Sequence, residues 1–168
     1  MKQLFTFGVF ISSAILGAFA NDKYIGNPTW DTFMKDQHLL DVNGNSISHE
    51  SLRGKYVGLY FSASWCSPCK SFTKKLVDFR NKNSDKFEFV LLSLDKNPTR
   101  RAEYIRTSKL SYVHGKSAHE LFPMLKSYTK RGTIPSVILF SPTRKFLTDS
   151  AQSYIVKYPS DIGKWFGR

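Results

Sequence analysis

Apolar residues along this chain form short continuous runs that alternate with segments in which they recur every three or four positions. Three runs, Tyr56–Phe61, Phe87–Leu94 and Ser136–Phe140, are typical of strands that are buried on both faces. Four other segments have a helical pattern and predict helices: 69–82, Thr99–Thr107, His119–Lys130 and Asp161–Phe166. Strands that alternate with helices imply crossover connections, so we expect an α/β domain with a mostly parallel central sheet.

The connecting segments predict several smaller features. Leu39–Val42 is a short apolar run that ends at an Asn-Gly turn signal, and Ser48–Gly54 is typical of one helical turn closed by glycine. Residues 110–119 predict a loop, and Pro123 fits the first turn of the helix that follows. Lys145–Thr148 is expected to return antiparallel to the strand before it.

The first twenty residues predict a secretory signal peptide. One cation, Lys2, precedes an apolar run from Leu4 to Ala20 that ends in small residues and is followed by abruptly polar chain. The alternative is a membrane anchor, but a spanning helix needs about 20 apolar residues, and this run is shorter and contains hydroxyl side chains. We therefore expect cleavage after Ala20, a single domain over 21–168 without stable membrane insertion, and a location in the periplasm or outside the cell.

Composition and charge exclude several classes of protein. The chain has 168 residues, of which 41% are hydrophobic and 23% charged, and it is too apolar for a disordered polyelectrolyte. Lys and Arg number 25 against 13 Asp and Glu, a formal net charge of +12. This excess is typical of a solvated surface that can also steer acidic partners or attract anionic membranes. The sequence contains no recognisable nucleic-acid-binding module, so we expect no nucleic-acid partner.

Both cysteines lie in the segment Trp65-Cys66-Ser67-Pro68-Cys69, between a predicted strand and a predicted helix. A thiol at a helix N-terminus lies near unpaired N–H groups and the positive end of the helix dipole, which favour the thiolate. Such sites lower a cysteine pKa from about 8.5 to about 3.5–7.5. We expect Cys66 to be the exposed nucleophile and Cys69, one turn inside, to be the resolving thiol. Pro68 is compatible with the first helical turn, where its missing N–H would be unpaired.

Other roles for the cysteine pair are less favoured. A purely structural disulfide that closes so small a loop would contribute only about 2 kcal/mol, less than a longer loop. A zinc site shared with His114 and His119 would need a spacing far beyond that of zinc fingers. We therefore predict no metal and no other cofactor. A non-catalytic binding protein whose cysteine pair is merely oxidised is the second hypothesis, and a secreted polyanion binder is the third.

The stretch from Tyr60 to Thr73, which contains both cysteines, resembles the tryparedoxin and nucleoredoxin branch of the thioredoxin-like superfamily. The resemblance ends at the segment Gly-Thr-Ile-Pro-Ser over 132–136 and covers roughly residues 39–148. It implies a thioredoxin-like fold, in which a central mixed β-sheet is flanked by helices on both faces.

The same resemblance implies a substrate-binding surface around the cysteines. Pro135 would be a cis proline that faces the two sulfurs, and the backbone of Ile134 would pair with an extended substrate segment. Trp65 and Pro68 would form the apolar rim of this surface, with Ser67 between them.

Two features depart from the family pattern. Tyr60 stands where many thioredoxins carry a buried aspartate, thought to assist proton transfer, so the proton acceptor for Cys69 stays unassigned. The predicted export signal means that the electron donor of the largely cytosolic tryparedoxins does not carry over. We expect a monomeric, exported thiol-disulfide oxidoreductase that acts as a reductase. Its expected partners are client proteins with disulfides or thiols and an unidentified thiol electron donor.

Overall fold

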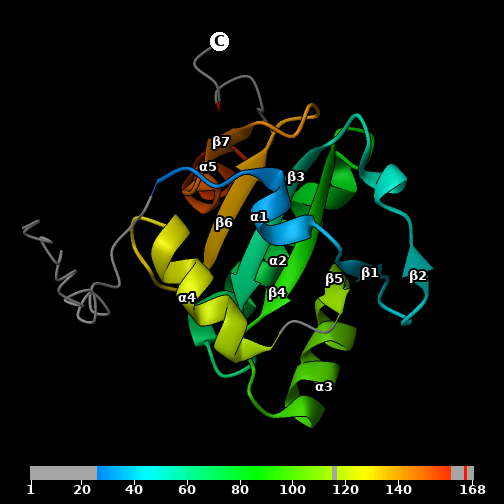
Figure 1. Cartoon of the computed structure of the whole chain (residues 1–168), viewed down its shortest axis with the longest axis vertical. Helices are drawn as coiled ribbons and strands as arrows, with labels where there is room; N and C mark the ends of the chain where they lie inside the picture. The colour runs from blue at the N-terminus through cyan, green and yellow to red at the C-terminus, as the bar shows by residue number, and fades with distance from the viewer. Residues whose placement is uncertain (1–25, 115–116, 160–164, 166–168) are drawn as a thin grey trace, which may run out of the picture.

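The computed structural model describes residues 26–114, 117–159 and 165, where one β-sheet lies between two layers of helices (Figure 1). In chain order the elements are α1 (Trp30–Met34), β1 (His38–Leu40), β2 (Ser46–Ile47), the 3-10 turn η1 (His49–Leu52), β3 (Tyr56–Ser62), α2 (Ser67–Lys82), β4 (Phe87–Ser93), α3 (Pro98–Ser108), β5 (Ser111–His114), α4 (Ala118–Tyr128), β6 (Ser136–Phe140), β7 (Phe146–Thr148) and α5 (Ala151–Lys157). The predicted signal peptide over 1–20 lies outside the described residues, as does the predicted helix at Asp161–Phe166 apart from Trp165. Among the described helices, none has the length and apolar character needed to cross a bilayer.

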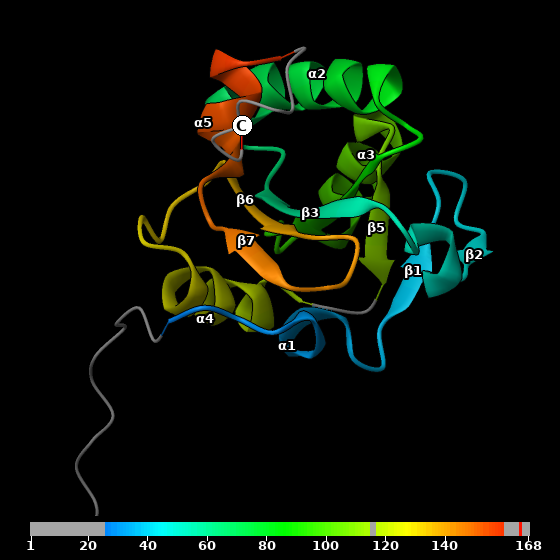
Figure 2. The ribbon, with the colours of Figure 1, turned by 90° about the horizontal axis from the view of Figure 1, so that it is seen from above.

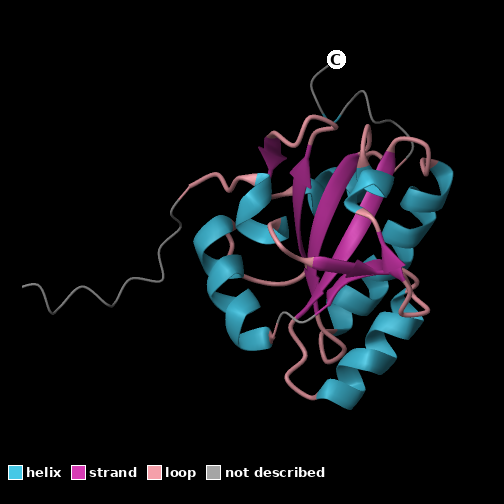
Figure 3. Cartoon of the chain, turned by 45° about the vertical axis from the view of Figure 1, so that its right-hand side comes forward, coloured by secondary structure: helices cyan, strands magenta, loops and turns pink. Residues whose placement is uncertain are grey.

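The sheet is mixed, as the family resemblance implies, and not mostly parallel, as the alternation of strands and helices predicts. The described strands lie in the order β2-β1-β5-β4-β3-β6-β7. Figure 3 shows the strands together, with helices around them. The pairs β3–β4 and β4–β5 are parallel. The other four neighbouring pairs are antiparallel, because two hairpins, β1–β2 and β6–β7, complete the sheet on its two sides.

Side chains of the central strands alternate between the two faces of the sheet, as strand geometry requires. Val57, Leu59 and Phe61 of β3 belong to an apolar cluster that α1 and α4 cover. Tyr60 belongs to a second cluster, on the opposite face, which α2, α3 and α5 cover (Figure 2). The continuous apolar run at 56–61 therefore reflects a strand whose two faces are both buried.

Gly58 shows why this strand contains a residue without a side chain. A Cβ atom at Gly58 would lie 2.3 Å from Cδ1 of Phe89, the residue paired with it on β4, and 3.0 Å from Cγ1 of Val137. The Phe89 ring fills the space over Gly58, so the two residues are complementary in size.

Several predicted element boundaries need correction. Residues 110–119 contain β5 in place of a simple loop, because the backbone of this segment pairs with both β1 and β4. Helix α4 begins at Ala118, where Ser117 and Glu120 form a capping box, so Pro123 lies inside the helix and not in its first turn. Helices α1 and α5 were not predicted, because they have only five and seven residues, too few for a clear periodic pattern.

Candidate redox site

The two cysteines lie where β3 gives way to α2, as predicted. Cys66 is the N-cap residue of α2, and its Sγ accepts a hydrogen bond from the backbone N–H of Cys69 at 3.2 Å. A sulfur in the N-cap position thus satisfies one of the unpaired N–H groups of the first helical turn. Ser67 begins the helix and Pro68 follows it, so the proline lies in the first turn, as predicted.

The two sulfurs form a disulfide, and their surroundings differ. The S–S distance is 2.03 Å, and the Cα atoms are 5.2 Å apart. Cys69 is completely buried, whereas 7% of the Cys66 surface is exposed to solvent. Cys66 is less exposed than predicted, because it packs into the same apolar cluster as Cys69 and Ala63. Cys66 is still the half of the pair that reaches solvent.

The residues predicted to bind substrate differ in their exposure. Trp65 is 56% exposed, one of the few large apolar side chains that the described surface leaves in solvent. Ser67 and Pro68 are also exposed. The peptide bond between Ile134 and Pro135 is cis, as the resemblance implies. Ile134 is partly buried and packs against the apolar cluster that contains the cysteines.

A buried carboxylate, Asp95, anchors the loop that leads to Cys66. Asp95 follows β4 and is 1% exposed. It accepts hydrogen bonds from the Ser64 N–H at 3.0 Å, the Ser64 hydroxyl at 2.6 Å and the Ser93 hydroxyl at 2.9 Å. From α3, the Arg101 guanidinium donates two hydrogen bonds to the Asp95 carbonyl oxygen. These hydrogen bonds therefore join the loop after β3 to the loop after β4, at the carboxyl ends of the two parallel strands.

Four buried hydroxyl groups lie behind the cysteines and form one hydrogen-bonded network. The Tyr60 hydroxyl donates to the Cys69 carbonyl oxygen at 3.1 Å, and the Thr73 hydroxyl donates to the same oxygen at 2.9 Å. The Ser62 hydroxyl donates to Tyr60 at 3.0 Å and lies 2.5 Å from the Tyr104 hydroxyl. Tyr104 and Thr73 are 3.0 Å apart. The network therefore holds the first turn of α2 against β3 and α3.

Tyr60 is the centre of this network and stays protonated. Burial raises the pKa of its phenol well above the ordinary value near 10, and the neighbouring Tyr104 raises it further. Its hydrogen bond ends on the backbone carbonyl oxygen of Cys69. Tyr60 thus replaces the buried aspartate of many thioredoxins with a neutral group that positions the helix backbone.

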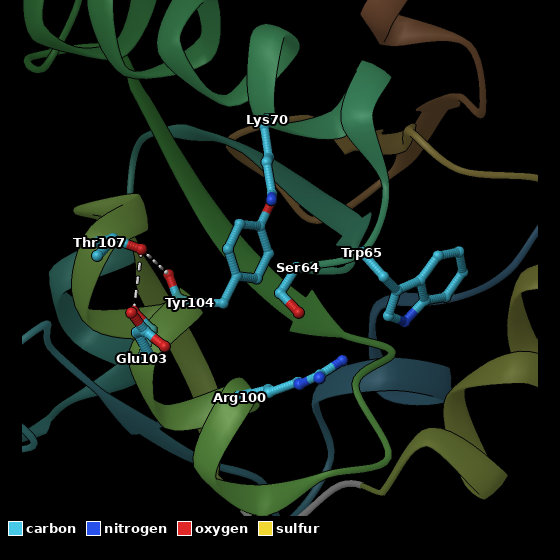
Figure 4. A pocket seen from close by; sticks show the side chains of 7 residues that line it. All are labelled: Ser64, Trp65, Lys70, Arg100, Glu103, Tyr104 and Thr107. Atoms are coloured by element: carbon cyan, nitrogen blue, oxygen red, sulfur yellow. Dashed lines mark hydrogen bonds between the residues drawn. The ribbon is translucent and has the colours of Figure 1, made fainter.

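Sequence reasoning missed a pocket beside the cysteine pair. It has a volume of about 380 Å³ and opens next to Trp65, between the N-terminal parts of α2 and α3 (Figure 4). Its lining comprises Ser64, Trp65, Lys70, Arg100, Glu103, Tyr104 and Thr107. Lys70 and Arg100 are far apart in sequence and look like two of many surface cations. No sequence signal brings them together, because their proximity depends on the parallel pairing of β3 with β4.

Within the part of the chain that the structure describes, no three His, Cys, Asp or Glu side chains are grouped so that they could hold a metal ion.

Comparison with known proteins matches this geometry to one family. A family model described as thioredoxin-like matches residues 54–146, which is more than half of the chain. The chain therefore belongs to the thioredoxin-like family. Nucleoredoxin from Bos taurus is 33% identical over 113 residues, which make up 66% of this chain and 26% of that protein. Tryparedoxin from Trypanosoma brucei brucei is 46% identical over 69 residues, 40% of this chain and 47% of that protein.

Solved structures agree with the sequence comparison. Native tryparedoxin I from Crithidia fasciculata superimposes with a TM-score of 0.67 at 30% identity, covering 82% of this chain and 95% of that one. A thioredoxin from Wuchereria bancrofti gives a TM-score of 0.60 at 27% identity. The chain spans only about a quarter of the length of the nucleoredoxins that it matches. It is a thioredoxin-like redox protein with the cysteine pair Cys66–Cys69, related to nucleoredoxins and tryparedoxins.

Proposed function

We propose that this protein is an exported thiol-disulfide oxidoreductase that reduces disulfides in client proteins. The observation that carries the proposal is the asymmetry of the cysteine pair. Cys69 is fully buried, whereas Cys66 caps the N-terminus of α2, directly follows the exposed Trp65 and keeps 7% of its own surface exposed. A client sulfur reaches the pair through Cys66, and Cys69 is held where it attacks Cys66 from inside.

The proposed reaction has two exchange steps. In the reduced protein, the Cys66 thiolate attacks one sulfur of the client disulfide, a mixed disulfide forms, and the other client sulfur leaves as a thiolate that takes up a proton. Cys69 then loses its proton and attacks the Cys66 sulfur. This step forms the intramolecular disulfide and releases the client as a dithiol. An external thiol donor must return two electrons before the next cycle.

The substrate surface follows from the same arrangement. Trp65 and Pro68 offer apolar contact area on one side of Cys66, and Ser67 lies between them. Ile134 and Pro135 lie on the segment that enters β6, and the Ile134 backbone would pair with an extended client segment. In this proposal, the protein acts as a monomer and needs no bound cofactor.

Reduction of insulin by dithiothreitol, with the full chain as catalyst, tests the proposed activity. We expect acceleration with the wild-type protein, none with Cys66→Ser, and a mixed disulfide that persists with Cys69→Ser. Absence of acceleration by the wild-type protein would refute the activity. Equal trapping by the two single variants would refute the separate roles of the cysteines.

The proposed export rests on the sequence of residues 1–20 and needs its own test. Expression of the full chain followed by cell fractionation should yield a protein outside the cytoplasm whose N-terminal residue is Asn21. An intact Met1 N-terminus in a cytoplasmic fraction would refute export, while leaving the proposed redox activity in place.

A further inference from the structure

The pocket next to Trp65 shares that residue with the substrate surface proposed above, and its other lining residues are not part of that surface. Two helices form it, and both begin at the carboxyl ends of neighbouring parallel strands, β3 and β4. In α/β sheets, this is the edge at which ligands commonly bind. Because Trp65 directly precedes Cys66 and also lines the pocket, a client held at Cys66 lies within reach of it.

The lining of this pocket contains two cations, Lys70 and Arg100. Figure 4 shows Arg100 extending from α3 toward Ser64 and Trp65, and Lys70 reaching from α2 toward Tyr104. Within the described residues, neither Lys70 nor Arg100 forms an ion pair. Both side chains are exposed, so their charges are available to a ligand.

The pocket lining contains two cations and one carboxylate, so its positive charge is compensated only in part. Glu103 is the one carboxylate in the lining, and it lies on the far side of Tyr104 from Trp65 (Figure 4). Asp95 is closer to Ser64 in the fold, but its oxygens face inward and accept hydrogen bonds from Ser64 and Ser93. The first turns of α2 and α3 contain no acidic residue, which leaves the positive ends of both helix dipoles unopposed.

We propose that this pocket binds a carboxylate of the client, carried by an Asp or Glu side chain next to the client cysteine. Arg100 and Lys70 pair with the carboxylate, and the Tyr104 ring forms the wall behind it. The role of the pocket in selecting clients rests on the proposed function, since selection requires that a client sulfur reach Cys66. Lys70 and Arg100 are specificity-determining residues in this proposal, because they touch a part of the client that does not react.

The expected size of the preference follows from the exposure of both cations. An exposed ion pair contributes about 0.2–1 kcal/mol, so two such pairs give a preference of about twofold to thirtyfold for an acidic client over a neutral one. Exposed charges are screened over about 8 Å at physiological ionic strength and about 3 Å at 1 M salt. The preference should therefore shrink toward onefold as salt is raised.

The test uses two peptide disulfides that differ only in carrying Glu or Gln on both sides of the cysteine. The full-length protein, kept reduced by dithiothreitol, should reduce the Glu peptide with a kcat/KM about twofold to thirtyfold higher than that for the Gln peptide. The variant Lys70→Gln with Arg100→Gln should bring this ratio close to one. The matched control, Lys74→Gln with Arg106→Gln, removes two exposed cations from the same helices outside the pocket and should keep the ratio.

A binding measurement separates failure of this inference from failure of the proposed function. The Glu peptide with Ser in place of Cys should shift the amide NMR signals of residues around the pocket in the oxidised protein, and the Gln peptide should shift them less. Selective binding without reduction of either peptide would refute the proposed function and leave the carboxylate site standing. The inference would be overturned if the pocket variant kept the wild-type ratio of kcat/KM for the Glu peptide over the Gln peptide. It would also be overturned if the control variant lowered this ratio as much as the pocket variant does.

Discussion

Replacement of Tyr60 by Phe removes one hydroxyl from the buried network behind the cysteines and leaves the ring in place. The side chain is completely buried, and its hydroxyl contacts Ser62, Thr73 and the Cys69 carbonyl oxygen. Each of these partners keeps another, since Ser62 and Thr73 both reach Tyr104 and Thr73 also donates to the Cys69 carbonyl. No buried group is orphaned, so the loss at neutral pH should be about 1 kcal/mol of unfolding free energy.

The sign of this effect should change with pH. The folded-state pKa of Tyr60 lies above its value in the unfolded chain, so the folded state keeps a proton that the unfolded state loses above about pH 10. The corresponding stability is fully present below pH 10 and falls by about 1.4 kcal/mol per pH unit above it. Tyr60→Phe lacks this titration. The deficit of about 1 kcal/mol at pH 7 should therefore vanish near pH 11.

Denaturant unfolding of wild type and variant at pH 7, 9, 10 and 11 measures the deficit in unfolding free energy at neutral pH and its change with pH. Thr73→Val is the matched control, because it removes a hydroxyl of the same network without removing a titrating group. Its deficit should stay constant over the same pH range. A Tyr60→Phe deficit that persists unchanged to pH 11 would refute the inference that Tyr60 stays protonated in the folded protein.

Three further substitutions probe the strand, the rim and the anchor of the site. Gly58→Ala should lower the unfolding free energy by about 1–3 kcal/mol, because its Cβ would overlap Phe89, and Phe89→Leu should partly restore it in a double-mutant denaturation series. Trp65→Ala should change stability by no more than about 0.5 kcal/mol, since the side chain is 56% exposed, yet slow exchange with a peptide disulfide several-fold in stopped-flow assays. Asp95→Ala should cost about 2–3 kcal/mol in thermal unfolding, because Ser64 loses its buried acceptor; a neutral result would contradict the anchoring role.

Much of the fold follows from the distribution of apolar residues. The runs at 56–61, 87–94 and 136–140 predict β3, β4 and β6 to within a residue or two, because strands buried on both faces leave a continuous signal. The placement of Cys66 as the N-cap of α2 was also predictable, since a cysteine pair with Pro68 directly precedes a helical pattern.

The features that the sequence did not predict depend on contacts between distant segments. Strand β5 has four residues and exists because β1 and β4 lie on either side of it. The burial of Cys66, which leaves only 7% of its surface exposed, depends on packing of the cluster around Ala63 and Cys69, which no local pattern encodes. The pocket brings Lys70 of α2 beside Arg100 of α3, and their proximity depends on which strands become neighbours in the sheet.

Cys66 is the reactive thiol of the proposed reaction, and alkylation of the reduced full-length protein is a direct test of this assignment. Iodoacetamide is added at a series of pH values, and mass spectrometry measures the modification of each cysteine. We expect Cys66 to react first, with a midpoint of its modification below about pH 7.5, and Cys69 to stay unmodified while the protein is folded. A Cys66 midpoint at or above about 8.5, the value of an ordinary thiol, or faster modification of Cys69, would contradict it.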